Sequence, residues 1–100
     1  MFRAIASPDA PKAIGPYSPA LRAGQLLFLS GQIPLDPVSG QIVGSDITAQ
    51  TEQVFRNIGA LLAAAGAGFE HVARTTVFLV DLNDFNAMNA QAMADRAMEL

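Results

Sequence analysis

The sequence predicts one small domain of mixed strands and helices, in the order strand, hairpin, helix, strand, helix. Three observations lead to this prediction. The chain has 100 residues, which is enough for one domain at most. Short apolar runs bounded by glycine and proline occupy its first part, which is typical of strands. Apolar residues at helical spacing then occupy its middle, which is typical of an amphipathic helix.

The first segments predict an edge strand followed by a hairpin. Residues 3–6 form the candidate edge strand, which ends at a proline-containing break. Residues 17–22 and 25–30 flank Ala23-Gly24 and are predicted to form the two arms of the hairpin. Residues 26–29 are apolar at every position, so this strand is expected inside the sheet, covered on both faces.

A turn and the clearest helix come next. Residues 36–40, Asp-Pro-Val-Ser-Gly, predict a turn from which a short strand at 41–43 returns. A helix is expected over residues 47–65, with Asp46 as its N-cap and Gly66 just beyond its end. Its apolar stripe comprises Ile47, Thr51, Val54, Phe55, Ile58, Leu61, Leu62 and Ala65, and its polar face comprises Gln50, Glu52, Gln53, Arg56 and Asn57.

The second half of the sequence begins with a clear strand pattern and helix pattern, and the apolar stripe of the helix is then lost. Residues 72–80 are apolar and rich in β-branched side chains, so a long strand is expected, which would be prone to aggregation if left at an edge. A second helix follows Leu82, with Asn83 or Asp84 as its cap. Its stripe of Phe85, Met88 and Ala92 continues into the charged residues Asp95, Arg96 and Glu99. We therefore expect the chain to be truncated, or out of register, near its end.

Composition narrows the class of protein. Hydrophobic residues make up 51% and charged residues 15%, which excludes disorder from low hydropathy. The net charge of −3 disfavours nucleic-acid binding. The lack of cysteine excludes disulfides, thiolate catalysis and cysteine-ligated zinc. With no signal-peptide pattern and no apolar run long enough to cross a bilayer, we expect a cytoplasmic protein that does not associate with membranes.

Four ordered motifs carry a resemblance to a known family. Residues 13–18, Ala-Ile-Gly-Pro-Tyr-Ser, resemble the entry motif of the reactive intermediate deaminase (Rid) proteins. Residues 29–34, Leu-Ser-Gly-Gln-Ile-Pro, resemble their second motif, and the turn at 36–40 follows it as in the family. Residues 75–85 together with Met88-Asn89 resemble a third block. The resemblance covers roughly residues 3 to 90.

The resemblance implies a fold, an assembly and a reaction. Residues 1–100 would form a single Rid-like domain, incomplete at its C-terminus. Its fold would be α+β and chorismate-mutase-like, a mixed sheet with two helices on one face, here lacking the last strands. Three copies would assemble as a homotrimer with clefts between neighbouring subunits. The implied reaction is hydrolysis of 2-imino acids and enamines, such as 2-iminobutanoate and 2-iminopropanoate, to 2-keto acids and ammonia, without a metal or cofactor.

The matched motifs also imply the site residues. Tyr17 and Ser30 are the expected catalytic residues, while Gly31, Asn89 and Phe85 are expected to contact the substrate. Each also has an ordinary structural interpretation. Without the motifs, Tyr17 and Phe85 are packing aromatics, Ser30 and Gly31 are turn formers, and Asn89 is a solvated helix residue.

Two expected features of the site are absent. Rid enzymes take an arginine for the substrate carboxylate from a strand after the second helix, and a glutamate from the final strand. Neither strand is present here, and nothing in the helix pattern makes Arg96 a substitute. The lone His71 and the carboxylates of Glu52 and Glu70 lie outside the motifs, so we expect them at the surface.

The activity of this chain is therefore expected to be impaired. The alternative is a non-catalytic small-molecule-binding or chaperone-like Rid module. RNA cleavage, known for some relatives, has no electrostatic basis in this acidic chain.

Overall fold

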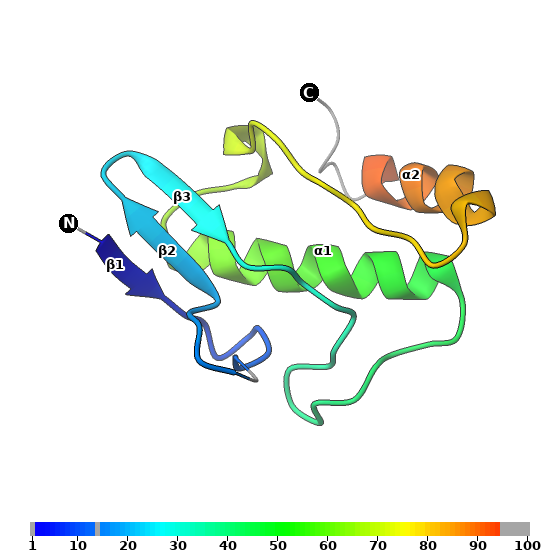
Figure 1. Cartoon of the computed structure of the whole chain (residues 1–100), viewed down its shortest axis with the longest axis horizontal. Coiled ribbons are helices and arrows are strands. Elements are labelled where there is room, and N and C mark those ends of the chain that lie inside the picture. Colours follow the sequence, from blue (N-terminus) through cyan, green and yellow to red (C-terminus); the bar gives the residue numbers. More distant parts are fainter. Residues whose placement is uncertain (1, 14, 95–100) are drawn as a thin grey trace.

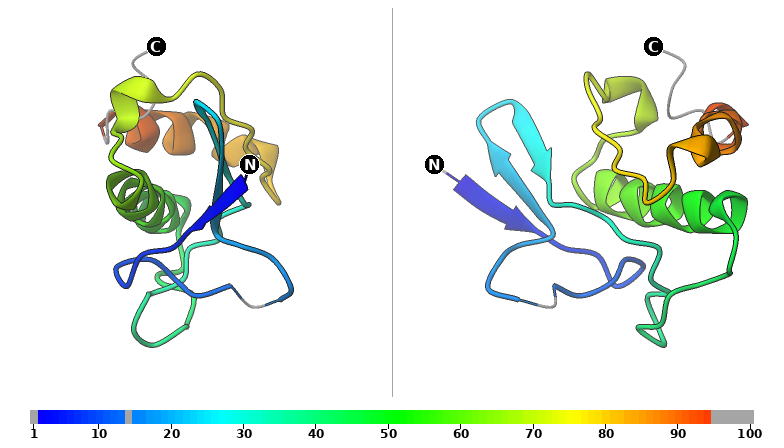
Figure 2. Two further views of the ribbon diagram at one scale, coloured as in Figure 1. Left: turned by 90° about the vertical axis from the view of Figure 1, so that its left-hand side faces the viewer. Right: turned by 45° about the vertical axis from the view of Figure 1, so that its right-hand side comes forward.

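The protein has an α+β fold in which one small sheet and two helices form two layers. A computed structural model describes residues 2–13 and 15–94. Helix α1 lies against one face of the sheet, and α2 packs beside α1 (Figures 1 and 2). None of the described helices is long and apolar enough to cross a bilayer. The elements are β1 (Phe2–Ile5), β2 (Ala20–Ala23), β3 (Leu26–Leu29), α1 (Ile47–Ala64), two 3-10 turns (Phe69–His71 and Leu82–Asp84) and α2 (Phe85–Ala94).

The described strands form an antiparallel sheet in the order β1-β2-β3. The predicted edge strand and hairpin are both confirmed. The hairpin loop lies one residue later than expected, at Gly24-Gln25, because Ala23 pairs directly with Leu26. Gly24 has a φ of 60°, a left-handed conformation that favours glycine and suits a two-residue hairpin loop.

The two faces of this sheet differ in their cover. On the face toward α1, Ile5 and Ala20 are buried with Leu61 of the helix. On the other face Phe2, Leu26 and Phe28 are exposed, although all are apolar. The expectation that residues 26–29 form an interior strand is therefore wrong for the described chain. Among those residues β3 pairs only with β2, and its second face has no covering layer.

Helix α1 begins and ends where the sequence predicts. The carboxylate of Asp46 accepts a hydrogen bond from the amide of Ala49 at 2.7 Å, which caps the first turn. Gly66 follows the C-cap with a φ of 77°, and its amide donates to the carbonyl of Ala63 at 3.0 Å. These two ends fix the length of the helix.

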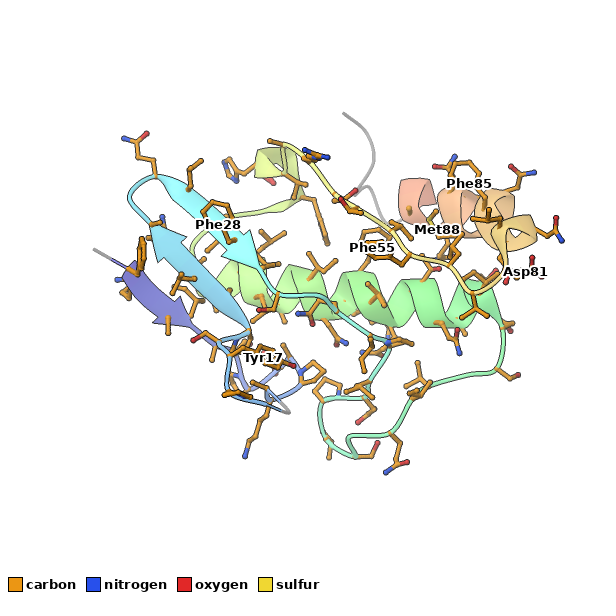
Figure 3. All side chains as sticks on the ribbon, viewed as in Figure 1. Tyr17, Phe28, Phe55, Asp81, Phe85 and Met88 are labelled. Atoms are coloured by element: carbon orange, nitrogen blue, oxygen red, sulfur yellow. The ribbon has the colours of Figure 1, made fainter. Side chains whose placement is uncertain are left out.

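A second apolar core joins α1 to α2. Phe55 of α1 is buried with Met88 and Ala92 of α2 (Figure 3). The rings of Phe55 and Phe69 meet edge to face, with centroids 6.2 Å apart. The predicted stripe on α2 is thus confirmed for Met88 and Ala92, whereas Phe85 points outward and is exposed. The charged residues Asp95, Arg96 and Glu99 lie outside the described residues.

The segment over residues 72–80 is not a strand, which corrects the prediction. It runs without regular structure, and Phe78 is 92% exposed. Strand propensity reflects fit to a pleated surface with paired neighbours. No described strand pairs with this segment. Its content of β-branched residues is therefore not sufficient to make it a strand.

Two shorter predictions are also corrected. Residues 41–43 make only a single bridge, between Ile42 and Leu35, instead of a strand. The cap before α2 is Asp81, whose carboxylate accepts from the amide of Asn83 at 2.9 Å. It lies earlier than the expected cap because a 3-10 turn over Leu82–Asp84 precedes the helix.

The predicted turn at 36–40 is confirmed, and its stability should depend on pH. The Asp36 carboxylate accepts from the amides of Ser39 at 2.9 Å and Val38 at 2.8 Å, and these bonds hold its pKa below the ordinary value of 3.8. These two hydrogen bonds contribute fully to the free energy of unfolding above pH 3.8. Their contribution is lost as the pH falls through the lower pKa that Asp36 has in the folded state. In an NMR titration, the amide signals of Val38 and Ser39 should shift with a midpoint below 3.8. Asp36→Asn should abolish that shift, and a midpoint at or above 3.8 would contradict the assignment.

Candidate functional site

An open cavity of about 150 Å³ lies between the loop before β2 and the segment after β3. Two of the predicted site residues, Tyr17 and Gly31, line this cavity. Its other walls come from residues 11–13, Pro19, Gln32, Ile33 and Leu35. The cavity is therefore built from the first two motifs and the residues just before them.

Ser30 joins the two motifs. Its amide donates to the carbonyl of Pro19 at 3.0 Å, which extends the pairing of β2 and β3 by one step. Its hydroxyl donates to the carbonyl of Ser18 at 2.6 Å. Ser18 follows Tyr17 in the chain, so the hydroxyl of Ser30 holds the backbone next to Tyr17. The oxygen of this hydroxyl can still accept a hydrogen bond from a ligand.

The backbone turns sharply just before Tyr17. The amide of Tyr17 donates to the carbonyl of Gly15 at 2.8 Å. A Cβ on Gly15 would lie 3.5 Å from the tyrosine ring, so the ring packs over the turn. The side chain of Tyr17 remains 47% exposed, at the edge of the cavity. The predicted rigid turn therefore places the phenol where a ligand entering the cavity can contact it.

The remaining predicted residues lie elsewhere. Phe85 and Asn89 belong to α2, and neither lines the cavity within one chain. Figure 3 shows Tyr17 on the loop between β1 and β2 and Phe85 on α2, on the other side of α1 in this view. One chain thus brings together Tyr17, Ser30 and Gly31, and it does not bring Asn89 or Phe85 to them.

The charges near the cavity are few. Lys12 is the one cationic residue among those lining it. His71 lies in the 3-10 turn after α1, where its Nδ1 accepts from the amide of Gly68 at 3.1 Å. Glu52 pairs with Arg56 on the exposed side of α1, as expected for a surface carboxylate. Among residues 2–13 and 15–94, no three acidic or histidine side chains gather as a potential metal site.

Sequence reasoning missed Asn57, which it placed on the solvated face of α1. Asn57 is 0% exposed. Its Nδ2 donates to the carbonyl of Leu35 at 3.0 Å and to that of Ile33 at 3.5 Å, and its Oδ1 accepts from Gln53 at 2.8 Å. Helical periodicity cannot separate a buried asparagine with distant backbone partners from a solvated one. Lys12 was missed because it precedes the matched motif.

Two relatives resemble the chain over most of its length. Protein DfrA of Myxococcus xanthus is 55% identical over 89 residues, which cover 87% of this chain and 68% of that protein. The human 2-iminobutanoate/2-iminopropanoate deaminase is 46% identical over 87 residues, covering 87% of this chain and 64% of that enzyme. The chain therefore spans about two thirds of the length of these relatives.

A solved structure and a family model agree with this likeness. The crystal structure of YyfA from Yersinia pestis, a protein of the conserved Rid family, superposes with a TM-score of 0.94 at 36% identity, covering 100% of this chain and 79% of that one. A sequence model of the family described as endoribonuclease L-PSP matches residues 7–97. The chain belongs to this endoribonuclease L-PSP family, and its relatives include Rid proteins.

Proposed function

We propose that the protein hydrolyses small 2-imino acids to 2-keto acids and ammonia. The observation that carries the proposal is the shared cavity of Tyr17 and Gly31, with the Ser30 hydroxyl bonded to the backbone of Ser18, the residue after Tyr17. The human relative with 46% identity is named for this activity. The cavity of about 150 Å³ is also of suitable size. A cavity of about this volume holds benzene in another protein, and 2-iminopropanoate has about as many non-hydrogen atoms.

The reaction makes limited demands on the protein. The carbon of a protonated imine is already electrophilic, so the site must mainly hold the substrate and orient a water molecule. Water forms the new C–O bond, and one proton passes from the water oxygen to the nitrogen. The C–N bond then breaks as the oxygen loses its second proton, which leaves the ketone and releases ammonia and a proton. A phenol can accept a hydrogen bond from the water, and it can donate one to the neutral nitrogen that forms once water has added; this is the role proposed for Tyr17.

Lys12 supports the choice of an anionic ligand. It contributes the positive charge of the cavity wall, and each 2-imino acid carries a carboxylate. An ammonium group attracts a carboxylate as a point charge, without the two parallel bonds of a guanidinium. The proposed ligand therefore has its carboxylate toward Lys12 and its imine carbon toward Tyr17.

The proposal includes assembly as a homotrimer. The apolar residues Phe2, Leu26 and Phe28 cover the sheet face opposite α1, and all three are exposed in one chain. A sheet face of this kind is normally covered by another layer. In a trimer the sheets of neighbouring copies supply that layer. The clefts between copies then let Phe85 and Asn89 of one subunit approach the cavity of the next.

Charge favours this reaction over RNA cleavage, despite the name of the family model. The chain carries a net charge of −3, whereas RNA binding relies on cationic side chains that neutralise phosphates. Among the described residues, the lone histidine takes no part in the cavity.

The test supplies 2-iminopropanoate from a dehydratase acting on serine, and follows the free imine by chemical trapping. We expect the imine to disappear faster in proportion to the amount of added protein. Tyr17→Phe should lower this rate by about a hundredfold, the size of a lost acid–base contribution. Val38→Ala, in an exposed turn away from the cavity, should not change it. Equal decay with and without the wild-type protein would contradict the proposal, and calorimetric binding of 2-oxobutanoate without turnover would indicate ligand capture alone.

A further inference from the structure

The segment that forms one wall of the cavity has little secondary structure of its own. Residues 31–34 lie outside every strand and helix, yet Gly31, Gln32 and Ile33 all line the cavity. The single bridge between Leu35 and Ile42 anchors the far end of the segment. Some other contact must fix its distance from α1.

The side-chain amide of Asn57 supplies that contact. Its Nδ2 donates to Leu35 and, at greater length, to Ile33, which lie 22 and 24 residues away in the sequence. Both acceptors are backbone carbonyls of the cavity wall. A buried amide without partners is costly, so the carbonyls and the amide hold one another in place.

A second residue orients the amide. Gln53, one turn earlier in α1, donates from its Nε2 to the Oδ1 of Asn57 at 2.8 Å. With its oxygen occupied in this way, the amide presents its NH₂ group to the wall. The direction of the wall contact is therefore determined within the helix, before any ligand binds.

We propose that Asn57 is a positioning residue, whose buried amide sets the place of the cavity wall at residues 31–35 and thereby the affinity of the cavity for its carboxylate ligand. The identity of that ligand rests on the proposed function; the role of Asn57 in the wall does not. Asn57 lines no part of the cavity and acts through the carbonyls of Ile33 and Leu35.

Tyr17 offers a direct reporter of the wall. It is the sole tyrosine of a chain without tryptophan, so fluorescence excited near 280 nm comes from the cavity itself. Asn57→Leu keeps the number and branching of the side-chain heavy atoms, adds some bulk, and removes all three hydrogen bonds. We expect it to raise the acrylamide quenching constant of Tyr17 at least twofold and to weaken the binding of 2-oxobutanoate, measured by calorimetry, at least tenfold.

The matched control is Leu61→Val, one turn further along the same helix. Leu61 is fully buried in a cluster with Ile5, Ala10 and Ala20, none of which belongs to the wall segment at residues 31–35. This variant also lowers the melting temperature, but it should leave Tyr17 quenching and binding at wild-type values. Comparison of the two variants at equal distance below their own melting temperatures separates positioning from general loss of stability.

A gentler variant covers the case in which Asn57→Leu does not fold. Gln53→Met removes only the bond that orients the amide, and it should change Tyr17 quenching in the same direction by a smaller factor. The positioning role is overturned if the acrylamide quenching constant of Tyr17 is the same in Leu61→Val as in Asn57→Leu. Where Asn57→Leu does not fold, Gln53→Met takes its place in this comparison. Increased quenching in a protein whose wild-type form binds no 2-oxobutanoate would support the role of Asn57 and contradict the proposed ligand.

Discussion

Phe28→Asp should convert the proposed trimer into monomers without unfolding the subunit. Phe28 pairs across the hairpin with Leu21 on the sheet face opposite α1, and it is 56% exposed in one chain. In the trimer the carboxylate would be buried in an apolar interface once per subunit, at a cost of several kcal/mol each. The three copies would also repel one another. The dissociation constant should therefore rise by a factor of about a hundred or more.

Light scattering measures this change directly. The wild-type mass should be three times the 10.5 kDa of one chain, and the variant mass should equal one chain. Val38→Asp is the control, because Val38 is 96% exposed in the turn at 36–40, away from the sheet face. Circular dichroism should show the same secondary structure in all three proteins. A trimeric Phe28→Asp protein would exclude this face as the interface, and a monomeric wild type would exclude the trimer.

Local signals predicted the hairpin, the turn at 36–40 and helix α1. The Asp46 cap, the Gly66 stop and the stripe of α1 are properties of neighbouring residues, and all are confirmed. Residues 72–80 were predicted to form a strand from their composition alone. This prediction was wrong because a strand requires a paired neighbour. The prediction that residues 26–29 are covered on both faces was wrong for a related reason. An apolar pattern predicts burial but does not identify the layer that provides it.

The candidate site divides in the same way. Tyr17, Ser30 and Gly31 were predicted from contiguous motifs, and the structure brings these motifs together through the bond from Ser30 to Ser18. Asn57 was missed because its partners lie more than twenty residues away and are backbone carbonyls, which carry no mark in the sequence. Whether Asn89 and Phe85 join the site depends on the proposed neighbouring subunit, which helical periodicity does not describe.

Phe55→Ala should cause the largest loss of subunit stability. Phe55 is 6% exposed and fills the space between Met88, Ala92 and the edge of the Phe69 ring. Loss of a buried phenylalanine costs about 3–5 kcal/mol, and a small domain has only about 5–15 kcal/mol in total.

Urea denaturation followed by circular dichroism measures the loss. Phe78→Ala makes the same chemical change at a side chain that is 92% exposed, so it should alter the free energy of unfolding by less than about 0.5 kcal/mol. The comparison separates the effect of burial from the effect of replacing phenylalanine by alanine. Equal losses in the two variants would mean that α2 does not pack on α1 in solution.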